Sequence, residues 1–150
     1  MQIEKILSAN QIQELIERNY GALPELKDFS IFSSGEDKIW IATKEVFNLK
    51  GTLRTNSMGL YIGKLKRGDK INLSVEGIQL LAKDANKNIV RVDEDNMKRF
   101  MRGSDISDFE KLNCEIENFV LVKYKEDFVG VGILNEDKVK NLLPKSKRIY

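Results

Sequence analysis

FVLVKYKEDFVGVGILNEDKVKNLLPKSKR, residues 119–148, is the segment whose pattern says most about the architecture. It contains two runs rich in β-branched and aromatic residues, separated by the charged pair Glu126-Asp127. This pattern predicts two paired strands joined by a turn. Gly130 and Gly132 alternate with apolar residues in the second run. Glycine inside a strand marks a bend, a bulge or the close approach of another backbone.

The end of the same segment is basic. No acidic residue follows Asp137, and the cations after it are Lys138, Lys140, Lys145, Lys147 and Arg148. Residues 1–50 carry six Lys/Arg against eight Asp/Glu, whereas residues 51–150 carry nineteen against fifteen. The basic excess in the second part favours a polyanionic ligand, although lysine-rich surfaces are also common as solvated faces.

Composition excludes several kinds of chemistry. The 150 residues contain no histidine and a single cysteine, Cys114, so an internal disulfide, a zinc cluster and a Ser-His-Asp triad are excluded. The carboxylates of Asp93, Glu94 and Asp95 fit the start of a helix better than a metal site. We therefore expect no catalysis, no cofactor and no metal. No apolar run approaches the roughly 20 residues of a membrane helix and no signal pattern is present, which favours the cytoplasm.

The first fifty residues are expected to form a small subdomain. Ser8 or Asn10 can cap a helix that ends at Gly21, and residues 29–32 and 38–42 are typical of a hairpin. Residues 43–47 have the pattern of one further helical turn. A helix–hairpin–helix unit of residues 1–50 would bury too little apolar surface to be stable alone, so we expect it to dock on the rest.

Residues 51–150 are expected to form a second domain built from short strands with helices between them. The pattern predicts strands over 60–66 and 88–92, helices after Ser74 and over 93–101, a turn at 67–70 and a loop over 104–117. Such an alternation is typical of an α+β fold with a small, partly open β-barrel rather than a doubly wound sheet.

Basic and aromatic residues of this second part are the candidate ligand contacts. Lysine and arginine can meet phosphates while a tyrosine face stacks on a base or ribose, and the alternative is an ordinary solvated surface. The candidates are Arg54, Tyr61, Lys64, Lys66, Arg67, Arg99, Arg102, Lys138, Lys140, Asn141, Lys145, Lys147 and Arg148, with Gly59, Gly63, Gly130 and Gly132 beside the same face. Structural alternatives stay open: the glycines can serve barrel curvature, Asn141 can build the final turn and Tyr61 can pack at the rim.

Taken in order, five pieces of the chain resemble a known family. They are SMGLYIGKL at 57–65, FMRG at 100–103, FVLVKY at 119–124, VGVG at 129–132 and VKNLLPK at 139–145. Together they resemble the PUA-like RNA-binding region that ends rRNA cytosine-5 methyltransferases of the Sun/Fmu type and that occurs in stand-alone archaeal ribosome-biogenesis proteins. The resemblance covers roughly residues 55–148, and residues 1–50 resemble the small domain that often precedes it.

The resemblance implies a mixed β pseudobarrel with short helices that binds structured RNA. The groove lies beside the first helix and a glycine-containing strand, which here would be Ser74–Ala82 and Gly59–Lys64. The methyltransferases' Rossmann domain and catalytic cysteines have no counterpart in the 150 residues. The implied function is therefore non-catalytic RNA binding in rRNA or tRNA modification or ribosome biogenesis. The alternative is a protein-interaction adaptor whose acidic first fifty residues dock a methyltransferase or a ribosome assembly factor.

Overall fold

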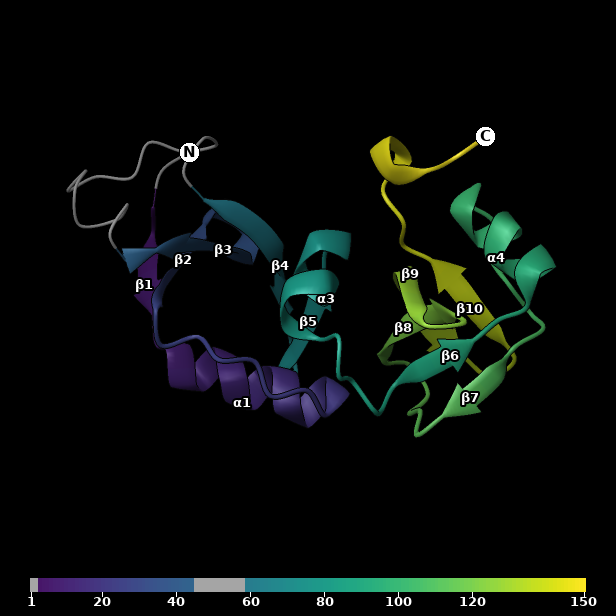
Figure 1. The fold of residues 1–150 in the computed structure, drawn as a ribbon, viewed down its shortest axis with the longest axis horizontal. Helices are drawn as coiled ribbons and strands as arrows, with labels where there is room; N and C mark the ends of the chain where they lie inside the picture. Colours follow the sequence, from purple (N-terminus) through teal and green to yellow (C-terminus); the bar gives the residue numbers. More distant parts are fainter. Residues whose placement is uncertain (1–2, 45–58) are drawn as a thin grey trace.

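A computed structural model describes residues 3–44 and 59–150. It confirms the predicted α+β class, and in the described residues the strands form two five-stranded sheets. Figure 1 shows the two sheets side by side, with the short helix α3 (Val75–Leu81) at the junction between them. Each of the described helices is too short or too polar to cross a bilayer.

The first sheet is antiparallel and strongly curled, with the order β1-β2-β3-β4-β5. Its strands are β1 Lys5–Leu7, β2 Phe29–Ser34, β3 Lys38–Thr43, β4 Leu60–Lys66 and β5 Lys70–Leu73, with the 3-10 turn η1 (Gly35–Asp37) between β2 and β3. Helix α1 (Ala9–Tyr20) closes the concave side of this sheet (Figure 1).

The second sheet has the order β10-β9-β8-β6-β7 and contains one parallel pair, β6 with β8. Its strands are β6 Ile89–Arg91, β7 Glu110–Leu112, β8 Phe119–Tyr124, β9 Asp127–Asn135 and β10 Lys138–Asn141. Helix α4 (Glu94–Met101) connects β6 to the β7 region, and the chain ends beyond the 3-10 turn η3 (Lys145–Lys147).

Helix α1 follows its sequence signals closely. The Ser8 hydroxyl accepts the first cap bond from the Gln11 backbone N–H at 3.5 Å, and Gly21 ends the helix in the left-handed conformation at φ 72°. Ile12 and Ile16 point into the curled sheet and are buried. The buried Tyr20 hydroxyl donates to the Ile71 carbonyl of β5 at 2.5 Å, and burial raises the Tyr20 pKa. The helix is thereby tied to the opposite edge of its own sheet.

The two sheets share one hydrophobic core. It joins Ile62 and Ile71 of the first sheet, Ile78 of α3, and Leu121 and Val131 of the second sheet. The second sheet also buries its other face, where a separate cluster packs α4 against β8, β9 and β10. Because both of its faces are covered, β8 is a nearly continuous apolar run rather than an alternating one.

Several strands differ from the sequence-based expectation. Residues 110–112 were expected in a loop and residues 138–141 in a basic tail, yet they form β7 and β10. Both are short strands at sheet edges, where one face meets solvent and the polar sequence carries little strand signal. The β8–β9 turn is Lys125-Glu126 rather than Glu126-Asp127, because Tyr124 pairs with Asp127.

The division between the sheets falls between β5 and β6. The boundary expected after residue 50 lies in the part of the chain that the structure does not describe. The next described strands, β4 and β5, hydrogen-bond into the sheet that contains β1, β2 and β3. The helical turn expected at 43–47 also extends into the undescribed segment, so it stays a prediction.

Gly77 gives the sharpest test of how α3 is seated. A Cβ at this position would lie 2.1 Å from the Ile62 carbonyl oxygen of β4. Gly77→Ala is expected to lower the free energy of unfolding by about 1–3 kcal/mol, since overpacking against backbone forces a shift. Urea unfolding followed by the fluorescence of the single tryptophan, Trp40, measures it.

Gly35→Ala is the matched control for this substitution. The nearest atom to its added Cβ is Glu4 Oε1 at 3.9 Å, so its stability should change by less than about 0.5 kcal/mol. Equal unfolding midpoints for the two variants would contradict the close seating of α3 on β4.

Candidate functional site

Three of the candidate cations are engaged by carboxylates. Lys64 Nζ lies 3.5 Å from Glu36 Oε2, and Lys138 Nζ lies 3.4 Å from Asp105 Oδ2. Lys147 forms an ion pair with Glu76 of α3, and its hydrogen bond to that carboxylate is the main cause that lowers the Glu76 pKa. These lysines are partly neutralised, so they contribute less to a field that attracts anions than their number suggests.

A second set of cations gathers at the carboxyl end of α4. The Asp93 carboxylate caps the start of this helix by accepting from the Asn96 N–H at 2.9 Å, which lowers the Asp93 pKa. At the other end, the exposed Arg99 and Arg102 occupy the last turn and the cap position. The sequence thus orients α4 with its acidic residues at the start and its arginines at the end.

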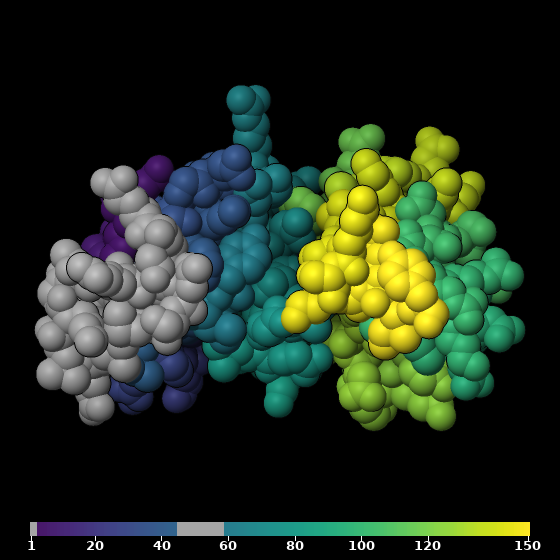
Figure 2. All heavy atoms as spheres, turned by 90° about the horizontal axis from the view of Figure 1, so that it is seen from above, coloured from purple at the N-terminus to yellow at the C-terminus, as the bar shows by residue number. Residues whose placement is uncertain are grey.

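The C-terminal segment packs against this end of α4. The Ile149 N–H donates to the Met101 carbonyl at 2.7 Å, and Arg148 Nε donates to the Leu143 carbonyl at 3.2 Å. Gly103 leaves room for the Arg148 side chain, since a Cβ there would lie 2.6 Å from Arg148 Nε. Figure 2 shows the C-terminal segment lying against α4. We call Arg99, Arg102, Lys145 and Arg148 the α4–tail surface.

Asn141 is a structural clamp within this region. Its side-chain amide donates to the carbonyls of Phe100 and Ser104, both at 2.8 Å, and its side-chain oxygen accepts from the Leu143 N–H at 2.7 Å. Both amide hydrogens are therefore engaged within the chain. The geometry fits the alternative in which Asn141 builds the final turn.

The remaining candidate cations lie on the other side of β10. Lys66 and Arg67 line a cleft of about 460 Å³ between the β4–β5 hairpin and the second sheet, together with Lys70. Lys140 pairs with Ile133, another residue of that cleft, so their side chains share a face. Val139 points to the opposite face, into the core under α4. The single stripe expected from the sequence is thus divided into two groups by the alternation of β10.

The candidate glycines lie at close contacts. A Cβ would lie 2.6 Å from the Asn72 carbonyl oxygen at Gly63, 2.7 Å from the Phe100 ring at Gly130, and 2.3 Å from Val139 Cγ1 at Gly132. Gly59 directly precedes β4. Gly63, Gly130 and Gly132 thus allow neighbouring strands, and α4, to pack closely against one another.

Tyr61 and Arg54 complete the candidate set. The partly buried Tyr61 ring lies 5.4 Å from the Trp40 ring, centroid to centroid, and burial raises its pKa. Arg54 lies outside the described residues.

Sequence reasoning missed Lys70 and Asn72. Both lie on β5 and face the cleft next to Lys66 and Arg67. The signal was present in the alternation of polar and apolar residues in Lys70-Ile71-Asn72-Leu73, which directly follows the predicted turn and has the period of a half-buried strand.

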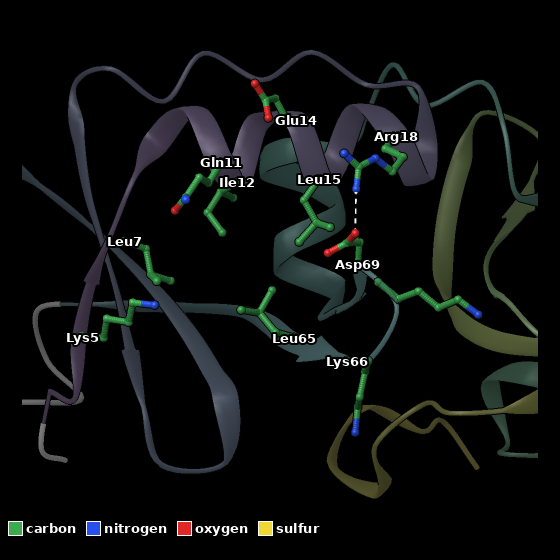
Figure 3. Close-up of a pocket in the computed structure, with 11 residues that line it drawn as sticks. Lys5, Leu7, Gln11, Ile12, Glu14, Leu15, Arg18, Leu65, Lys66 and Asp69 are labelled. Carbon is green, nitrogen blue, oxygen red and sulfur yellow. Dashed lines mark ion pairs between the residues drawn. The ribbon is translucent and has the colours of Figure 1, made fainter.

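A second cavity, of about 380 Å³, lies between α1 and the first sheet (Figure 3) and shares Lys66 and Lys70 with the cleft described above. Apolar side chains of Ile12, Leu15 and Leu65 line it, and an ion pair of 3.1 Å between Arg18 and Asp69 borders it. Elsewhere among the described residues, Cys114 has a pKa raised by burial, and no three His, Cys, Asp or Glu residues are placed to hold a metal ion.

Comparison with known proteins identifies the second half of the chain. Residues 87–149 match the family described as the PUA domain of methyltransferase RsmF. This part of the chain resembles a PUA domain. The fold agrees with the crystal structure of a PUA domain from Aeropyrum pernix K1, in a tartrate complex, at a TM-score of 0.55 and 13% identity over 95% of this chain and 86% of that one. No curated protein matches the sequence.

The matched PUA-like region begins later than the resemblance suggested. It starts at residue 87 rather than near residue 55, so the SMGLYIGKL motif lies before it. Within the matched residues the first helix is α4 and the strand that carries glycines is β9. Gly130 lets these two elements touch through Phe100. The groove expected beside residues 59–64 and 74–82, which precede the matched residues, stays a prediction.

The clamp role of Asn141 predicts a loss of stability on its removal. Asn141→Ala should lower the free energy of unfolding by about 1–3 kcal/mol, because the Phe100 and Ser104 carbonyls lose their donors in a partly buried site. Thermal or urea unfolding measures the change. The neighbouring, exposed Lys140→Ala should change stability by less than about 0.5 kcal/mol. If the two variants unfold alike, the clamp is not contributing.

Proposed function

We propose that this protein is a non-catalytic RNA-binding protein that holds structured RNA on the α4–tail surface. It acts in rRNA or tRNA modification or in ribosome biogenesis, and any chemistry on the RNA is carried out by a partner enzyme. The match of residues 87–149 to the PUA domain of a methyltransferase supports this proposal. The resemblance to RNA-binding PUA-like regions supplies the class of ligand.

The arrangement of three arginines carries the proposal. Arg99, Arg102 and Arg148 come together at one end of α4, and none of them has a carboxylate oxygen within 4.0 Å among the described residues. Their guanidinium groups are permanently charged and present fork-like donors that match phosphate oxygens. Cations left without carboxylate partners on one surface favour an anionic ligand with several charges.

Structured RNA fits this surface better than a small anion. At the α4–tail surface, Arg102 lines an open hollow of about 250 Å³ together with Met97, Met101 and Ile149 among others, and Arg99, Lys145 and Arg148 lie outside it. Double-stranded RNA is recognised through its shape, its phosphates and its 2′-hydroxyls, which requires donors spread over a surface rather than a pocket. The donors of α4 and of the C-terminal segment are spread in this way.

Replacing Arg99 and Arg102 by alanine tests the proposal. Binding of the unmodified protein to an rRNA stem-loop should weaken as the salt concentration rises. In a plot of log affinity against log salt concentration, each duplex phosphate that the protein contacts should contribute about −0.9 to the slope. The double variant should bind about tenfold or more weakly and should reduce the salt slope by about two. Fluorescence anisotropy titrations between low and physiological salt measure both quantities.

Lys27→Ala with Lys83→Ala removes the same charge elsewhere and is the control. Both lysines are exposed: Lys27 lies in the loop after α1, and Lys83 follows α3 beside Asp84, whose carboxylate accepts from the Leu23 N–H of that loop. Equal losses in the two double variants would show a nonspecific charge effect and would contradict the assignment. If the protein binds no stem-loop at low salt but retains a protein partner after nuclease treatment, it is an adaptor instead.

A further inference from the structure

A groove runs along the seam between the two sheets, on the side of the second sheet opposite α4. The cleft beside the β4–β5 hairpin, of about 460 Å³, shares Asn72 and Leu142 with a smaller hollow of about 80 Å³. The smaller hollow continues to Tyr61 and Pro144. We call these two adjoining hollows together the seam groove. Its larger part has the size of a small-molecule or single-nucleotide site.

One wall of the seam groove is cationic. Lys66 and Arg67 have no carboxylate partner within 4.0 Å among the described residues. Asp69, the acidic residue of the same hairpin, is engaged by Arg18 at 3.1 Å. The Lys70 ammonium donates to the Glu117 carbonyl oxygen at 3.1 Å and so reaches across the seam.

The opposite wall belongs to the second sheet. Lys140 is the cross-strand partner of Ile133 and shares its face of the sheet, although Lys140 itself is not one of the lining residues. The cations that line the larger part are Lys66, Arg67 and Lys70, and the one acidic residue that lines it is Glu117.

The floor of the seam groove is apolar. Phe119 and Ile133 are cross-strand partners in the second sheet, and Leu142 lies beside them. Ile133 and Leu142 are partly exposed, whereas Phe119 is 9% exposed. The Asn72 side chain lies on the same groove and has no hydrogen-bond partner among the described residues. A carboxamide of this kind can both donate and accept, as the edge of a base requires.

We infer that the seam groove binds an unpaired RNA strand, a few nucleotides next to the stem held by the α4–tail surface; this rests on the proposed function. The phosphates face Lys66 and Arg67, the bases lie on the apolar floor, and Asn72 contacts a base edge. An apolar floor lined by cations suits unpaired nucleotides, because in a duplex the base faces are stacked and only phosphates and groove edges remain accessible.

The experiment compares two RNAs that differ only in an unpaired extension. One is a blunt stem-loop and the other is the same stem-loop with a six-nucleotide single-stranded tail. The unmodified protein should bind the tailed RNA about tenfold more tightly, as expected from one or two bases in contact. Lys66→Ala with Arg67→Ala, and separately Asn72→Ala, should abolish that advantage and leave binding of the blunt stem-loop unchanged. Unchanged melting temperatures confirm that both variants fold.

The outcomes separate this inference from the proposed function. Equal affinity of the unmodified protein for the two RNAs overturns the seam site. Equal weakening of both RNAs by Lys66→Ala with Arg67→Ala also overturns it, since the cations would then contact the duplex. Two competitors of the tailed RNA are also compared: an oligoglutamate peptide and a free six-nucleotide strand. If the peptide displaces the tailed RNA as effectively as the free strand, the groove is assigned to an acidic protein segment instead. In a last outcome, the variant with Arg99→Ala and Arg102→Ala binds the blunt stem-loop as tightly as the unmodified protein, while the seam-groove variants still lose the tighter binding of the tailed RNA. This result contradicts the proposed role of the α4–tail surface and supports the seam site.

Discussion

The close contact of α3 with β4 and β9 is the constraint on which the arrangement of the two sheets depends. Ile78 of α3 packs in the same cluster as Ile62 of the first sheet and Val131 of the second, so one short helix fills the junction. Gly77 allows this only because it has no side chain to meet the Ile62 carbonyl. Ser74 secures the start of the helix by donating to the Tyr61 carbonyl and accepting from the Gly77 N–H. The width of the seam groove is set by this junction.

The parts of the fold that could be read from the sequence are those with strong local signals. Helix α1 carries a cap at Ser8, a glycine stop at Gly21 and a clear apolar face, and β8 and β9 carry long β-branched runs. The edge strands β1, β7 and β10 could not be read in the same way. They have three or four residues each; β1 and β7 acquire their conformation from a partner strand distant in the sequence, and the polar β10 acquires it from its hairpin with β9.

The candidate site could be predicted in its residue types but not in its grouping. The excess of cations in the second part was visible, as were Arg99 and Arg102 at the end of a helix. Which of them keep their charge available depends on tertiary neighbours, such as Asp105 beside Lys138 and Glu76 beside Lys147. The amide of Asn141 looked like a ligand contact and is engaged by two backbone carbonyls instead. Sequence spacing contains none of this information.

The alternation of β10 has a consequence for how one RNA could use both surfaces. Val139 faces the core under α4 and Lys140 faces the seam groove, so the two surfaces lie on opposite sides of the second sheet. The two surfaces approach each other at the C-terminal segment, where Pro144 lines the smaller hollow of the seam groove and the next residue, Lys145, belongs to the α4–tail surface. An unpaired strand can turn sharply where it leaves a stem. A junction between paired and unpaired RNA is therefore a ligand geometry that suits the α4–tail surface and the proposed seam site together.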